Sequence, residues 1–248
     1  MASDLKGPCL IKGRITRFGD QNSEASNILL IDDVATALDV TVSADIPIIR
    51  LKENEWLQPG YRDDHIHVMS VLASLCSLNV SFCETIPELI QTLAEAKSND
   101  VEWLRVWGYD DALLRERRHP TRKELDRATG DIPTILHHRT GHVAVANSAA
   151  LLALGVPNIS SEILVERHDL LAKVPRLSLS KIQSAASKMF QQCEEDGLVS
   201  LTDATHTNNI DSLELLDSLF NSAISPNLVA MVGAENLGGL FYGKRFRN

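Results

Sequence analysis

The sequence predicts an α/β protein with a small β-rich segment in front of it, and three observations support this. Residues 8–52 contain short apolar runs separated by polar turns, without helical periodicity. After Trp56, strand-length apolar runs alternate with segments that carry helix start and stop signals, which is typical of parallel β-α units. The 248 residues are enough to bury a sizeable core.

Only strands are expected in the first part of the chain. Short β-rich runs of this kind predict a small sheet or a sandwich. We therefore expect residues 1–55 to form a β-rich accessory domain and residues 56–248 to form the main domain. The four expected strands are CLIKGRITR (9–17), NILLID (27–32), LDVTV (38–42) and IPIIRL (46–51).

The main domain carries local signals for helices. Thr85 and Glu88, and again Thr121 and Glu124, have the spacing of capping boxes at helix N-termini. Asn147 or Ser148 can cap a further helix, which the glycine at position 155 ends. The expected helices are 86–97, 122–129, 148–154, 180–195 and 211–220, and the expected strands between them are 101–109, 133–138, 198–203 and 227–233.

Composition excludes several classes of protein. The net charge is −9, and no broad basic stripe is present, so we expect no nucleic-acid partner. The sequence has no apolar run of about 18 residues and no apolar region near its start, which predicts a cytoplasmic protein without a membrane partner. The four cysteines form no CxxC pair, and reduced thiols are therefore expected.

The most informative segment contains His65 and His67. Alternate residues of a strand project from the same face, so the two imidazoles should lie together. Two imidazoles on one face provide half of a metal site, because a catalytic metal needs at least three protein ligands and an open position. By itself the pair is also compatible with a polar surface strand.

Several motifs in order carry a family resemblance. Residues 59–67, PGYRDDHIH, resemble the PGxxDxHxH signature that opens the barrel of the amidohydrolase superfamily. Segments 102–110, 119–126 and 141–151 look like its family 3 subgroup, and the resemblance covers the N-terminal portion of that family's pattern. It implies a TIM-type (β/α) barrel, with one or two divalent ions, zinc being the expected metal, bound first by His65 and His67. Asp63 is then the acidic residue of the signature.

Four further positions are candidates. His142 lies in a GHxxxxNS element that, by the resemblance, contacts substrate or supports the metal shell; a structural loop histidine is the alternative. Asp203 resembles the aspartate of a GVTSxxD element, for which catalysis and buried capping are both open. His137 and His138 end a predicted strand, and only one of two adjacent residues can face the barrel interior.

The resemblance also implies what is missing. The superfamily plan adds a carboxylated lysine, two later histidines and a final aspartate, and no such motifs follow Asp203. Only the first four to five barrel strands can be placed. We therefore expect a second polypeptide to complete the barrel of a hydrolase that cleaves a small-molecule amide or related C–N bond with metal-activated water. The alternatives are a non-catalytic structural or regulatory fragment and a self-sufficient mononuclear metal hydrolase.

Overall fold

The structure is a computed structural model that describes residues 7–16, 24–31, 34–97, 102–159, 161–222 and 224–239. Its contacts divide the chain into two compact units, Met1–Tyr61 and Arg62–Asn248. The division therefore falls after Tyr61, a few residues beyond the boundary expected between 55 and 56.

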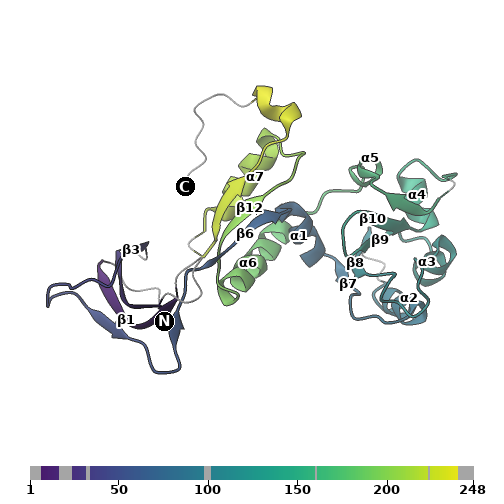
Figure 1. Cartoon of the computed structure of the whole chain (residues 1–248). Coiled ribbons are helices and arrows are strands. Elements are labelled where there is room, and N and C mark those ends of the chain that lie inside the picture. Colours follow the sequence, from purple (N-terminus) through teal and green to yellow (C-terminus); the bar gives the residue numbers. More distant parts are fainter. Residues whose placement is uncertain are drawn as a thin grey trace. The chain divides into compact units, whose positions relative to one another are not determined.

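The first unit is built on one five-stranded sheet (Figure 1). Its strands run in the order β3-β2-β1-β4, and β5 also pairs with β1. A small core of Ile11, Ile15, Ala25 and Ile28 lies against the sheet. The described residues of this unit form no second sheet, and the run expected at 38–42 lies mostly beyond the end of β3. The strands are β1 (Cys9–Thr16), β2 (Glu24–Ile31), β3 (Val34–Leu38), β4 (Ile48–Arg50) and β5 (Trp56–Leu57).

The second unit contains a three-stranded sheet of order β13-β12-β6. β12 and β13 are parallel, and Ala204 N–H donates to Ile66 O where β12 and β6 end. Helices α1 and α6 lie beside these strands in Figure 1 and share one apolar core with α7 and β12. The elements are β6 (Tyr61–Ile66), α1 (Val68–Leu75), α6 (Leu179–Glu195), β12 (Leu198–Asp203), α7 (Ile210–Phe220) and β13 (Asn227–Ala230).

The segment between α1 and α6 forms a separate five-stranded sheet of order β11-β10-β9-β8-β7. β7, β8 and β9 are parallel, whereas β10 is antiparallel to both of its neighbours. Two apolar cores lie against this sheet. The elements are β7 (Leu78–Asn79), α2 (Ile86–Glu95), β8 (Leu104–Tyr109), α3 (Arg122–Thr129), β9 (Thr134–His138), β10 (Val143–Ala146), α4 (Ser148–Ala153), β11 (Ile163–Val165) and α5 (His168–Leu171); a 3-10 helix, η1 (Ala234–Gly239), follows β13.

This arrangement changes the expected order of strands. We expected β6, β8, β9 and β12 to follow one another around one barrel, but β8 and β9 belong to the other sheet. The partial TIM barrel is therefore not confirmed, and the described residues form no closed barrel; the fold is mixed α/β. The reason is that periodicity marks a strand without identifying its neighbour, and β6 pairs with a strand more than 130 residues later.

The helix starts predicted from local capping signals are confirmed. Thr121 and Glu124 make both halves of the capping box at α3, and Thr85 accepts from Glu88 N–H at α2. Asn147, rather than Ser148, caps α4. The short elements α1, β10 and β11 were not expected. All four cysteines are free, and no helix in the described part of the chain is long and apolar enough to cross a membrane.

Candidate functional site

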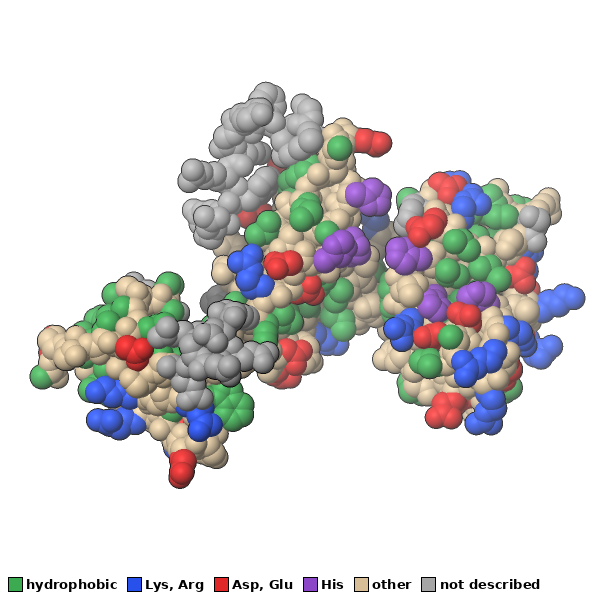
Figure 2. Space-filling view, in the orientation of Figure 1, with side chains coloured by type: hydrophobic (Ala, Val, Ile, Leu, Met, Phe, Trp, Pro, Cys, Tyr) green, Lys and Arg blue, Asp and Glu red, His purple; other side chains and the backbone are tan. Residues whose placement is uncertain are grey.

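His65 and His67 lie together at the end of β6. Their ring centroids are 5.3 Å apart with an interplanar angle of 81°, and both side chains are exposed. Figure 2 shows histidine side chains at the surface of the molecule. The backbone N–H of His65 donates to Asp63 Oδ1 at 3.0 Å, which fixes the strand end just before the pair. Two neighbouring imidazoles are thus exposed at the end of one strand, His65 within β6 and His67 directly after it.

The ring of His67 is oriented by the loop that follows β12. Its Nδ1 lies 3.1 Å from Thr205 Oγ1, a residue 138 positions later in the chain. A histidine that ligates a metal through Nε2 commonly has its Nδ1 held by such a partner. Thr205 therefore positions His67 with its outer nitrogen free for a ligand.

Asp203 is completely buried behind this pair, and its carboxylate joins the two strand ends. Oδ2 accepts from Val68 N–H at 3.0 Å, and Oδ1 accepts from Thr205 N–H at 2.8 Å and from Asn208 Nδ2 at 3.3 Å. Val68 is the first residue of α1, whose N-cap, His67, makes no side-chain capping bond. Asp203 thus supplies from β12 the acceptor that the helix start lacks.

The loops beyond β12 and β13 are packed tightly around this carboxylate. Asn208 Nδ2 also donates to Met231 O at 3.0 Å, and Met231 N–H donates to Asp203 O at 2.8 Å. A Cβ at Gly233 would lie 1.7 Å from His206 O, so only glycine fits there. These contacts give Asp203 a bracing role in the geometry; its catalytic role stays a prediction.

His142 lies at the edge of the five-stranded sheet, directly before β10, and is exposed. Its Nδ1 lies 2.7 Å from Glu166 Oε1, and Glu166 N–H donates to His142 O at 3.0 Å. His142 thus forms a surface pair with Glu166, and the roles predicted for it stay predictions.

The Asn147-Ser148 part of the same motif is structural. Asn147 is fully buried; its Oδ1 accepts from Thr134 N–H and Ala150 N–H, and its Nδ2 donates to Ile132 O at 2.8 Å. Ser148 donates from both N–H and Oγ to the carboxylate of Asp126. Segments 119–126 and 141–151, which both carry the family resemblance, therefore contact each other through hydrogen bonds that stabilise the fold.

His137 and His138 point to different environments, as expected for adjacent strand residues. His137 stacks on Trp107 with centroids 4.9 Å apart, and burial, aided by the charge of Arg105, lowers its pKa to about 4. His137 is therefore neutral at pH 7. His138 instead faces two aspartates, which the sequence reading did not identify.

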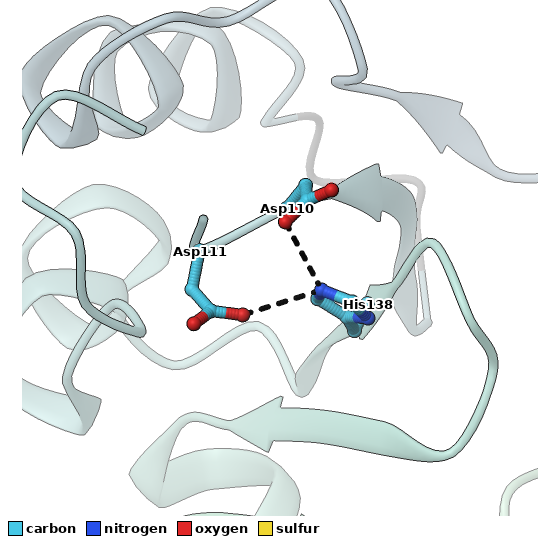
Figure 3. Close-up of side chains that lie close together, drawn as sticks. All are labelled: Asp110, Asp111 and His138. Atoms are coloured by element: carbon cyan, nitrogen blue, oxygen red, sulfur yellow. Dashed lines mark ion pairs between the residues drawn. The ribbon is translucent and has the colours of Figure 1, made fainter. Parts of the chain in front are cut away.

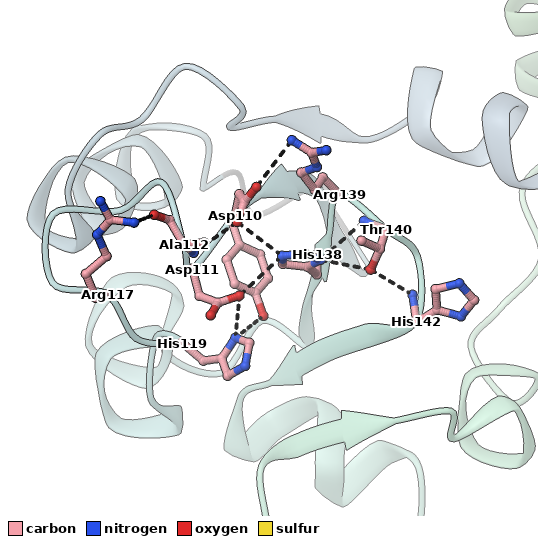
Figure 4. Close-up of polar contacts among 10 residues, drawn as sticks. Asp110, Asp111, Ala112, Arg117, His119, His138, Arg139, Thr140 and His142 are labelled. Atoms are coloured by element: carbon pink, nitrogen blue, oxygen red, sulfur yellow. Dashed lines mark hydrogen bonds and ion pairs between the residues drawn. The ribbon is translucent and has the colours of Figure 1, made fainter.

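The second polar cluster of the unit consists of Asp110, Asp111 and His138 (Figure 3). His138 Nε2 lies 3.3 Å from Asp111 Oδ1 and 3.6 Å from Asp110 Oδ1. On the other side of the ring, Nδ1 lies 2.9 Å from Thr140 Oγ1 (Figure 4). Two carboxylates and an imidazole nitrogen are donors that suit a divalent metal.

A bulge in β8 creates this cluster. Trp107 pairs with His137 but Tyr109 pairs with His138, so Gly108 is an extra residue on β8. Its φ of 105° is favourable only for glycine, and an added Cβ would lie 3.2 Å from Asn79 Oδ1. Bulges redirect the residues that follow them. The signal in the sequence was the WGYDD run itself, with glycine inside a strand.

Tyr109 closes the cluster from behind. It is 1% exposed, its ring lies edge-on to His138 with centroids 5.1 Å apart, and its hydroxyl lies 3.0 Å from His119 Nδ1. Burial, followed by the charges of Asp111 and Asp110, raises the Tyr109 pKa. The phenol therefore stays neutral and can donate to His119.

The chain matches the model of a known protein family. The amidohydrolase family model matches residues 53–223, which is more than half of the chain. The chain therefore belongs to the amidohydrolase family, and the resemblance seen in its motifs is confirmed.

Curated relatives match parts of the chain. It is 30% identical over 102 residues to an N-substituted formamide deformylase of Arthrobacter pascens, a match that covers 40% of this chain and 19% of that protein. It is 25% identical over 162 residues to the putative amidohydrolase YtcJ of Bacillus subtilis, which covers 56% of this chain and 30% of YtcJ. The chain thus spans less than a third of either relative.

Solved structures share the fold. An uncharacterized metal-dependent hydrolase from Pyrococcus furiosus superposes with a TM-score of 0.65 at 21% identity, over 96% of this chain and 54% of that one. A second one, from Pyrococcus horikoshii OT3, gives 0.61 at 21% identity, over 91% and 48%. At this identity the likeness concerns the fold.

Proposed function

We propose that this chain contributes the first part of a metal-dependent hydrolase that cleaves an amide or related C–N bond in a small molecule. The observation that carries the proposal is the pair of imidazoles at the end of β6, 5.3 Å apart and open to a ligand. Membership of the amidohydrolase family supports it, as does similarity to a protein named as a formamide deformylase. We further propose residues 1–55 as the accessory domain and 56–248 as the catalytic part.

The donor set fits a divalent ion, for which zinc is our proposal. His65 and His67 would hold it through imidazole nitrogens, which zinc accepts well. Such an ion supplies Lewis acidity, which activates water and polarises a carbonyl group at neutral pH. On this chain, Thr205 orients His67, and Asp203 fixes the start of α1 relative to the end of β12. We keep His142 as a proposed contact of substrate or support of the metal ligands. For Asp203, where catalysis and capping are both open, the hydrogen bonds favour positioning.

Two histidines do not complete a catalytic metal site, because such sites use at least three protein ligands. We therefore propose that the other ligands and strands come from residues outside this sequence, supplied by a complementary polypeptide. The exposed apolar side chains of the three-stranded sheet, Val199 and Val229, agree with a further partner for it, since each is about half exposed.

The test is the double variant His65→Ala/His67→Ala. We expect it to lose at least one equivalent of zinc per chain in elemental analysis, and to lower amide hydrolysis by the completed enzyme at least a hundredfold, because the metal ligands are removed. The matched control is His206→Ala, an exposed histidine on the loop after β12.

Unchanged turnover in the folded double variant would reject the assignment. Zinc bound by the pair without turnover in any complex would instead favour a non-catalytic subunit. Full activity of this chain alone would favour a self-sufficient mononuclear hydrolase and reject the complementary polypeptide.

A further inference from the structure

We propose that Asp110, Asp111 and His138 form a second metal site, separate from His65 and His67, that binds a divalent transition-metal ion such as Zn²⁺. The three ligand atoms, one from each residue, lie within 4.8 Å of one another. They come from the ends of the neighbouring parallel strands β8 and β9, and they point toward one another in Figure 3. The proposal does not depend on the hydrolase activity proposed above.

The distances fit metal ligands better than a direct hydrogen bond. His138 Nε2 is 3.3 Å from Asp111 Oδ1 and 3.6 Å from Asp110 Oδ1. A good N–H···O bond is about 2.7–3.2 Å long between its heavy atoms. Ligands that lie about 2.0–2.1 Å from a tetrahedral zinc ion are about 3.3 Å from each other.

The histidine nitrogen that faces the carboxylates has no hydrogen-bond partner. His138 Nε2 is fully buried and unsatisfied among the described residues, and the side chain is only 11% exposed. Leaving a buried polar atom without a partner costs about 1–3 kcal/mol. A metal ion between this nitrogen and the two carboxylates would remove that cost.

The other ring nitrogen can support metal binding. Nδ1 lies 2.9 Å from Thr140 Oγ1, which can accept a proton from it and so leave the Nε2 lone pair for the ion. Thr140 N–H also approaches Nδ1 at 3.2 Å, which favours a proton on Nε2 when no metal is bound. Zinc binding at Nε2 would therefore require the ring proton to move from Nε2 to Nδ1, where Thr140 Oγ1 can accept a hydrogen bond from it.

Charge and access also suit a cation. Asp110 Oδ2 lies 3.3 Å from Arg139 Nη1, and Asp110 Oδ1 accepts from Ala112 N–H. Asp111 Oδ1 lies 3.7 Å from His119 Nδ1, which already has Tyr109 as a partner. The two carboxylates and the one arginine together carry one negative charge. Asp110 and Arg139 also line a cavity of about 590 Å³, from which an ion can reach the Asp110 carboxylate.

The experiment uses the full chain with His65→Ala/His67→Ala, so that the first pair cannot bind metal. Zn²⁺ is titrated by calorimetry, and Co²⁺ by its visible absorption. We expect one ion per chain. Asp111→Asn and Asp110→Asn preserve shape but remove a charged ligand, and each should weaken Zn²⁺ binding at least tenfold. Asp131→Asn is the matched control at an exposed acidic residue of the same unit and should have no effect.

His138→Ala should abolish binding; if it does not fold by circular dichroism, the two amide variants decide the question. Absence of Zn²⁺ and Co²⁺ binding by the folded chain would overturn the proposal and leave His138 as a protonated partner of two carboxylates. Binding that neither amide variant changes would overturn it too, since the ion would then lie elsewhere.

Discussion

The two sheets of the second unit end in polar clusters of opposite construction. At the end of β6 and β12 the carboxylate of Asp203 is buried, and the histidines are exposed. At the end of β8 and β9, the side chain of His138 is only 11% exposed, whereas that of Asp111 is 35% exposed. Asp203 accepts three hydrogen bonds from N–H donors, whereas His138 Nε2 has no hydrogen-bond partner in the described part of the chain.

This difference distinguishes a buried side chain that holds backbone segments in place from one that can bind an ion. A buried carboxylate whose oxygens are occupied by backbone and amide donors holds the chain in place and has little capacity left for chemistry. A buried nitrogen that faces two carboxylates and has no hydrogen-bond partner would be stabilised by a bound ion. The comparison therefore predicts that substitutions at the first kind of residue affect stability and those at the second kind affect metal binding.

Asp203→Asn should have the largest effect on stability. The amide keeps one acceptor oxygen, and its NH2 group must face an N–H donor, either Val68 or Thr205. We expect the free energy of unfolding to fall by about 2–4 kcal/mol. Urea denaturation measures this, with Asp217→Asn, an exposed aspartate on α7, as the control. Equal effects of the two substitutions would remove the bracing role from Asp203.

Glu124, at the start of α3 beside the five-stranded sheet, is a second carboxylate whose hydrogen bonds hold backbone segments in place. Bonds from Arg118 and Thr121 lower its pKa to about 2 from a usual 4.5. Because the folded pKa is lowered, this stabilisation is complete above pH 4.5 and is lost as pH falls toward 2. We expect a loss of about 2 kcal/mol over this window, measured by urea denaturation.

Glu124→Gln is the comparison for that experiment. It removes the titrating group, so its stability should depend less on pH between 4.5 and 2 than that of the unaltered chain. An identical pH dependence of the two proteins would show that other carboxylates cause the loss.

His142→Ala should have the smallest effect on stability. Its partner Glu166 is also exposed, and exposed pairs contribute about 0–1 kcal/mol. We expect a change below about 0.5 kcal/mol in thermal or urea unfolding. If His142 contacts substrate, KM should rise while stability stays the same. A loss above about 1 kcal/mol would instead identify a structural loop histidine.

The sequence predicted the features whose determinants lie close together in the chain. Thr121 and Glu124 are three residues apart, and a helix begins where they predicted it. His65 and His67 are two residues apart in a strand, and their rings are neighbours. Both predictions needed only the geometry of one element.

Features made by distant residues were not predictable in this way. The pairing of β6 with β12 depends on contacts such as Val68 with Asp203, 135 residues apart. The cluster at His138 depends on the register of β8 and β9 and on the bulge at Gly108, because without the extra residue Asp110 would project differently. Neither register nor sheet neighbours can be read from periodicity.

The inserted five-stranded sheet also affects the order of folding. It has its own apolar cores, and all of its strands lie between β6 and β12 in the chain, so it can form first and shorten the effective loop between them. At about 5–20 residues per second of synthesis, the 135 residues from Val68 to Asp203 take roughly 7–27 s to emerge. During that interval the strand that carries the histidine pair has no β12 beside it, and its unpaired edge is open to association with other chains.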